Sequence, residues 1–181
     1  MTLAQRLQTF ASGAADRARD IGLPVEQAQQ LYSDRLEPMF IKNISPFVIP
    51  FVRRSRVKVL ELQPGRVVCE MPLKGNVNHI GTMYAGALFT LAEFPGGPLM
   101  LGTFGMRRFI PIVTSLDMEF VKTAKSNVRI ELTLSKNDAK KIEAETVAQG
   151  QAAFVLEGEL KDASGTVVAR SVAHYLMRPR R

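Results

Sequence analysis

The stretch from Met83 to Phe94 limits the possible folds of this chain more than any other. Read as a helix, it has apolar residues on every side: Met83, Tyr84, Ala87, Leu88, Phe89, Leu91, Ala92 and Phe94. A surface helix shows one apolar stripe, so a helix that is apolar all round should be buried in its own domain. One carboxylate, Glu93, interrupts this surface. A charge in such a place is expected to be paired, hydrated or used in chemistry.

A proline limits this helix, which we expect over residues 82–94. Pro95 has no amide hydrogen and disfavours helical geometry at Phe94, so the helix should end or kink there. A further turn is expected over residues 98–104. Glu93 would then lie beside a helix break, where backbone groups and water can reach it.

The remainder of the domain alternates as β-strands do, apart from one short helix expected over residues 136–149. The Gln63-Pro64-Gly65 sequence has the composition of a tight hairpin turn. A strand pair, a buried helix and then several antiparallel strands form an α+β pattern in which a sheet curls around one helix. The expected strands are residues 56–62, 66–72, 110–121, 127–134, 151–160 and 166–177.

Residues 1–40 are expected to be an N-terminal helical extension, and residues 41–181 the main domain. Leu3, Leu7 and Phe10 fall on one face of a first helix, and Pro24 suits the first turn of a second. The extension would either pack on the main domain or form a contact between two copies.

Several classes of protein are disfavoured by composition. The chain of 181 residues has no run of about 18 apolar residues that could span a membrane. Its one cysteine, Cys69, alternates with apolar neighbours, which indicates a buried strand residue. The two histidines, His79 and His174, are too far apart in sequence to suggest a metal site. No signal-peptide pattern follows Arg6, and we expect a cytoplasmic protein.

The net charge of +7 is concentrated in two blocks. Residues 42–74 hold seven basic residues against two acids, and residues 107–141 hold eight against four. Such a face suits a polyanion: a nucleic acid, a membrane surface or the phosphates of coenzyme A. The alternative is an ordinary solvated surface.

The segment from Asn78 to Gly97, NHIGTMYAGALFTLAEFPGG, resembles the central-helix motif of hotdog-fold acyl-CoA thioesterases, in particular the phenylacetate-pathway type and its uncharacterised relatives. That motif reads roughly N-x-x-G-(T)-x-H-G-G-A-L-x-x-L-A-(D/E). The His-Gly-Gly of the family is Tyr84-Ala85-Gly86 here, and the resemblance covers roughly residues 46–177. The positions in step with the motif are Asn78, Gly81, Thr82, Gly86, Ala87, Leu88, Leu91, Ala92 and Glu93.

The resemblance implies a hotdog fold, an antiparallel sheet wrapped around a long central helix. It also implies hydrolysis of an acyl-CoA thioester to a free acid and coenzyme A, with no cofactor and no metal. The amide of Ala85, with Gly86, would bind the oxyanion, and Glu93 would act as general base or as nucleophile. Asn78 would position the acyl carbonyl or the water, and the substrate-binding candidates are His79, Thr82 and Tyr84.

Three of these residues also have a purely structural interpretation. Glu93 could cap a strand or pair with an arginine, Asn78 could serve merely to shape its loop, and His79 could be an ordinary loop residue.

Basic side chains would bind the phosphates of coenzyme A. The candidates are Arg107, Arg108, Lys122 and Lys125.

The spacing of the two catalytic groups predicts an assembly. Ala85 and Glu93 are eight positions apart, or roughly 12 Å along a helix. Catalytic contacts are about 3 Å long, so one helix cannot place both groups on one thioester. The resembling family pairs two such helices at a two-fold axis, and we expect a homodimer, or a dimer of dimers, with shared sites.

Two other functions remain open from the sequence. A non-catalytic hotdog protein that binds acyl-CoA or a fatty acyl chain is favoured by Tyr84 and Ala85 in place of His-Gly. A nucleic-acid-binding module is suggested by charge alone, because the sequence has no recognised binding motif and no tryptophan.

Overall fold

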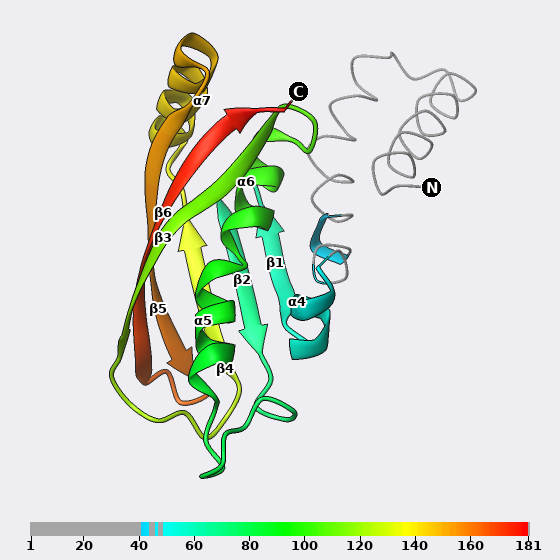
Figure 1. The fold of residues 1–181 in the computed structure, drawn as a ribbon, viewed down its shortest axis with the longest axis vertical. Helices are drawn as coiled ribbons and strands as arrows, with labels where there is room; N and C mark the ends of the chain where they lie inside the picture. Colours follow the sequence, from blue (N-terminus) through cyan, green and yellow to red (C-terminus); the bar gives the residue numbers. More distant parts are fainter. Residues whose placement is uncertain (1–40, 44–45, 47–48, 181) are drawn as a thin grey trace, which may run out of the picture.

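A six-stranded antiparallel sheet with the strand order β1-β2-β4-β5-β6-β3 forms the frame of the molecule (Figure 1). The computed structural model describes residues 41–43, 46 and 49–180. The edge strands are β1 and β3. The strands are β1 (Lys58–Gln63), β2 (Arg66–Met71), β3 (Phe109–Phe120), β4 (Val128–Thr133), β5 (Ala152–Asp162) and β6 (Val167–Pro179).

Two helices, α5 (Ala85–Glu93) and α6 (Gly96–Phe104), follow one another along the concave face of the sheet (Figure 1). Their inward residues, such as Leu91 and Leu99, are completely buried in the core. The short helix α4 (Pro50–Ser55) lies beside β1, and α7 (Lys136–Gln149) connects β4 to β5 at the end of the sheet far from the start of α5. The sheet therefore wraps one helical rod, as the sequence predicted.

The alternation of side chains explains which face of each strand meets the helices. On β2, Val67, Cys69 and Met71 are fully buried, while the residues between them point to the other face of the sheet. Cys69 is thus the buried strand residue that was predicted, and burial raises the pKa of its thiol.

Most expected elements are confirmed with small shifts at their ends. The helix over residues 136–149 is found with the same bounds, and the six strands are found within a few residues of the expected ranges. The hairpin turn holds Gly65 at φ +80°, and its carbonyl accepts a hydrogen bond from the Leu134 amide at 2.8 Å. The expected helices within residues 1–40 lie outside the described residues.

The central helix differs from its prediction at two points. It begins at Ala85, not at Thr82, because the Met83 amide donates to the Ala124 carbonyl and the Tyr84 amide to the Asn76 carbonyl, both at 2.8 Å. The second helix begins at residue 96, two residues earlier than expected. Pro95 keeps helical backbone angles (φ −62°, ψ −24°), so the break is a kink between two nearly continuous helices.

None of the described helices has the length and apolar character needed to cross a bilayer.

Candidate active site

The loop before α5 is organised by Asn78. Its side-chain oxygen accepts hydrogen bonds from the amides of Ile80 and Thr82, both at 3.1 Å, and its Nδ2 donates to the Thr82 hydroxyl at 2.9 Å. Thr82 is buried, whereas His79 is exposed. These contacts give Asn78 the loop-shaping role that was its structural interpretation, and they engage the Thr82 hydroxyl within the loop.

The N-terminus of α5 carries two amides that find no acceptor among the described residues. Tyr84 is the N-cap in extended geometry, and no side chain caps the helix. The first bonds of the helix come from the Ala87 and Leu88 amides to the Tyr84 carbonyl. Ala85 is exposed and Gly86 is partly exposed, so their amide hydrogens are accessible. Amides without an acceptor at a helix N-terminus, together with the positive end of the helix dipole, favour the binding of an anion.

The Tyr84 ring covers the opening turn of this helix from one side. A Cβ on Gly86 would lie 2.4 Å from the ring, so the ring rests against the glycine. Tyr84 itself is 59% exposed. The aromatic side chain that replaces the histidine of the resembling motif therefore borders the two free amides.

Glu93 lies at the opposite end of α5, at the kink. Its side chain is half-buried, and no described residue forms an ion pair or a side-chain hydrogen bond with it. The loss of water contacts raises the pKa of this carboxyl, because burial disfavours the charged form. The arginine pairing considered from the sequence is therefore absent from the described part of the chain.

One face of α5 is left uncovered by the sheet. Ala85, Phe89 and Glu93 follow one another at intervals of four residues, which places them on a single stripe of the helix. Phe89 is 45% exposed, although it lies in the middle of the helix. The prediction that the helix is buried on all sides is wrong for Tyr84 and Phe89, because one sheet covers only part of a helix.

The neighbouring edge strand extends this uncovered surface. Val113 and Phe120 on β3 pair in register with the buried Tyr175 and Ala169, so they share the concave face of the sheet with α5. Both nevertheless stay exposed. We call Phe89, Val113 and Phe120, with the two ends of α5, the concave strip.

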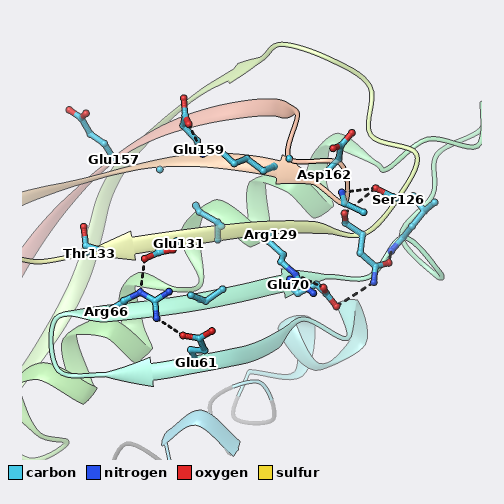
Figure 2. Close-up of a pocket in the computed structure, with 18 of the residues that line it drawn as sticks. Glu61, Arg66, Glu70, Ser126, Arg129, Glu131, Thr133, Glu157, Glu159 and Asp162 are labelled. Atoms are coloured by element: carbon cyan, nitrogen blue, oxygen red, sulfur yellow. Dashed lines mark hydrogen bonds and ion pairs between the residues drawn. The ribbon is translucent and has the colours of Figure 1, made fainter.

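A hollow of about 1300 Å³ lies on the other face of the sheet (Figure 2). Several of its charged side chains pair with one another. Arg66 bridges Glu61 and Glu131, and Arg129 binds Glu70 at 2.7 Å. These side chains stand on the strand positions that point away from α5, so the hollow cannot bring a ligand to Glu93 or to the amides of α5.

The basic candidates are all exposed. Of these, Arg108 pairs with Glu143 at 2.5 Å and lies over the Phe109 ring. Arg107, Lys122 and Lys125 form no ion pair with another described residue. No group of three metal-ligating side chains occurs in the described ranges.

A family described as a domain of unknown function (DUF4442) matches residues 39–176, which is most of the chain. The chain belongs to the DUF4442 family. One solved structure is similar in sequence and fold: a protein of unknown function from Pseudomonas aeruginosa, described as a probable thioesterase, is 43% identical. The match covers 78% of this chain and 95% of that one, with a TM-score of 0.75. No curated protein matches this DUF4442 chain.

More distant structures share the fold of this DUF4442 protein. A mutant of a thioesterase from Pseudomonas aeruginosa has 12% identity and a TM-score of 0.60, over 76% of this chain and 91% of that one. A mutant of a thioesterase from Staphylococcus aureus has 15% identity and a TM-score of 0.59, over 72% and 100%. With the sheet wrapped around α5 and α6, these likenesses confirm the hotdog fold that the motif implied.

The structure brings the sequence-predicted site residues of this DUF4442 protein to the two ends of one helix. Asn78, His79, Thr82, Tyr84, Ala85 and Gly86 gather at its start, and Glu93 stands alone at its end. Tyr175 was not predicted from the sequence as a site residue, yet its hydroxyl donates to the Glu93 carbonyl at 2.9 Å. A buried tyrosine needs a partner for its hydroxyl, so its place between the inward residues Ala173 and Met177 was the available signal.

Proposed function

We propose that this protein hydrolyses an acyl-CoA thioester to a free acid and coenzyme A. The observation that carries the proposal is the uncovered stripe of α5, where the amides of Ala85 and Gly86 and the carboxylate of Glu93 find no partner among the described residues. A thioesterase needs these two kinds of group. Hydrogen-bond donors stabilise the carbonyl oxygen as it becomes negative, and a carboxylate either activates a water molecule or attacks the carbonyl carbon directly. The similar Pseudomonas aeruginosa protein, described as a probable thioesterase, supports the same reaction class.

The chemistry follows from the two groups. In the general-base route, Glu93 takes a proton from water, the resulting hydroxide attacks the thioester carbon, and the amides hold the oxyanion. Collapse of this intermediate breaks the carbon–sulfur bond, and the thiolate leaves and takes up a proton. In the nucleophilic route Glu93 attacks directly, and water then cleaves the anhydride. Single turnover in ¹⁸O-labelled water separates the routes, because label found in the Glu93 carboxyl requires the anhydride.

The site is proposed to form between two subunits. The nine residues of α5 separate Ala85 from Glu93 by roughly 12 Å, which exceeds the reach of one thioester group. The concave strip offers apolar side chains on which a second copy could pack, and an exposed edge strand beside them. A homodimer that pairs the two strips would bring the amides of one subunit to the carboxylate of the other. A dimer of dimers would contain the same pair.

The test is hydrolysis of a panel of short, long and aromatic acyl-CoAs by the wild type and by Glu93→Gln. We expect the wild type to release coenzyme A and the variant to lose at least about a hundredfold in kcat. Glu157→Gln is the matched control, since Glu157 is an exposed glutamate on the outer face of β5. Turnover that Glu93→Gln leaves unchanged would exclude the proposed role.

A second candidate, acyl-CoA binding without turnover, is favoured by the Tyr84 ring against Gly86, which narrows the approach to the amides. Calorimetry with the same acyl-CoAs distinguishes it from hydrolysis: tight binding with no release of coenzyme A over hours would support the binding function.

A further inference from the structure

The kink between α5 and α6 leaves the Glu93 carbonyl without its usual helical partner. In an unbroken helix the Gly97 amide would donate to it, but that amide donates to the Phe94 carbonyl at 3.2 Å. The Tyr175 hydroxyl takes the vacant place and donates to the Glu93 carbonyl at 2.9 Å. A side chain of β6 thus replaces a backbone donor at the residue that carries the carboxylate.

Tyr175 is held rigidly in this position. Its ring is 4% exposed and stacks on Phe154 with centroids 5.2 Å apart and an angle of 10° between the planes. Phe154 is its register partner on β5 and Val113 its partner on β3, so strands on both sides of β6 hold the tyrosine in place. The hydroxyl therefore has little freedom to follow the helix if the helix moves.

Gly96 completes the contact. A Cβ on this residue would lie 2.1 Å from the Tyr175 oxygen, so the hydroxyl occupies the space that any other side chain would fill. The close contact therefore requires both a glycine at the first position of α6 and a tyrosine 79 residues later in the chain. Burial raises the pKa of the Tyr175 hydroxyl, and the negative charge of Glu93 raises it further. This effect of Glu93 agrees with a hydroxyl that lies close to that residue.

We propose that Tyr175 is a positioning residue for Glu93, because its hydroxyl ties the kink of the central helix to β6 and so fixes where the carboxylate stands. The proposal rests on the proposed hydrolase function for its catalytic consequence, but the geometric claim concerns the placement of Glu93 alone. In this role Tyr175 would contact neither the thioester nor the attacking water. It acts through the backbone of the residue that does.

Tyr175→Phe is the decisive variant, since it removes the hydroxyl and keeps the stacked ring. We expect kcat for acyl-CoA hydrolysis to fall at least about tenfold while KM changes less than about threefold, because substrate contacts are kept and the carboxylate is displaced. Ser171→Ala is the matched control: it also removes a buried β6 hydroxyl directed at a backbone carbonyl, that of Gly158, away from the kink. Its kcat should equal that of the wild type.

A second readout does not depend on activity. The Glu93 carboxyl carbon is followed by NMR as a function of pH in wild type, Tyr175→Phe and Ser171→Ala. A carboxylate released from its half-buried place gains water, so its midpoint should move toward that of an exposed glutamate in Tyr175→Phe only. If Tyr175→Phe does not fold, Gly96→Ala, which crowds the hydroxyl, is measured in its place.

The outcomes separate the two claims. Full kcat and an unmoved Glu93 titration in Tyr175→Phe overturn the positioning role even if Glu93→Gln is inactive. Equal losses in Tyr175→Phe and Ser171→Ala overturn it as well, because they indicate a general loss of packing. If the wild type hydrolyses no acyl-CoA, the hydrolase function fails, and the Glu93 titration alone decides the position of the carboxylate.

Discussion

At the level of single residues, Glu93 combines an unfavourable environment with the absence of a described charge partner. A carboxylate kept half-buried without a cation destabilises the folded chain, and groups with shifted pKa values of this kind concentrate at functional sites. The carbonyl of the same residue is fully engaged with Tyr175. The backbone is thus fixed while the carboxylate stays available, which is the arrangement that a base or a nucleophile requires.

The raised pKa of Glu93 gives a pH-dependent stability effect. The folded state holds the proton more tightly than the unfolded chain, whose glutamate has a pKa of about 4.3, so the free energy of unfolding falls as pH rises through the folded-state value. The stabilisation that protonated Glu93 gives is therefore fully present at pH values below the pKa of glutamate in the unfolded chain. Glu93→Gln should therefore raise Tm at neutral pH, and the gain should shrink near pH 4. Thermal unfolding at both pH values measures it, and a gain that is independent of pH would contradict the account.

At the level of elements, the N-terminus of α5 can be tested without damaging the helix. Ala85 is its first residue, and Tyr84 before it has φ −66° and ψ 136°, which suits a residue preceding proline. Ala85→Pro removes one of the two proposed oxyanion donors, the Ala85 amide, and keeps the Gly86 amide. We expect kcat to fall by about 10²–10³-fold with Tm nearly unchanged.

Lys136→Pro is the control for that substitution. Lys136 is the exposed first residue of α7 and follows Ser135, whose backbone is similarly extended. It should leave both kcat and Tm close to the wild type. A fully active Ala85→Pro enzyme would remove the Ala85 amide from the mechanism.

The β1–β2 hairpin depends on a glycine for two separable reasons. Gly65 has φ +80°, and a Cβ there would lie 2.6 Å from the Leu134 carbonyl oxygen. Gly165, in the turn between β5 and β6, has a similar φ of +84° with open space around it. Gly165→Ala should cost about 1 kcal/mol of backbone strain, and Gly65→Ala at least about 2–3 kcal/mol because a backbone clash is added. Urea unfolding measures both, and equal losses would show that the clash relaxes freely.

Elements were the most predictable part of this fold. The helix over residues 136–149 was predicted at its exact bounds because its start and end signals are local: Ser135 accepts from the Asp138 amide, and Gly150 ends the helix at φ +74°. The start of α5 was predicted three residues early, because the Met83 and Tyr84 amides are taken by Ala124 and Asn76, contacts that no local pattern reveals.

At the level of the whole molecule, the proposed dimer predicts complementation between two inactive variants. In Ala85→Pro mixed with Glu93→Gln, a heterodimer has one site with both groups intact, one from each subunit. Random exchange of subunits should restore about a quarter of the wild-type activity. Activity of refolded mixtures is the measurement. No recovery in mixtures whose heterodimers are verified by native mass spectrometry would place both groups of each site in one subunit.

The division into a helical extension over residues 1–40 and a main domain over residues 41–181 stays a prediction, as does the cytoplasmic location. The family match covers residues 39–176 and leaves both untested.

The sequence alone determined the strands, the kink at Pro95 and the motif on the central helix, because alternation, proline geometry and capping act over a few residues. Tertiary structure decided which parts of that helix remain uncovered, since this depends on how far the curled sheet reaches around it. It also brought Tyr175 to the carbonyl of Glu93 across 82 residues of chain. Such a contact follows from strand order and register, which pair Tyr175 with Phe154 and Val113, and these are properties of the assembled sheet.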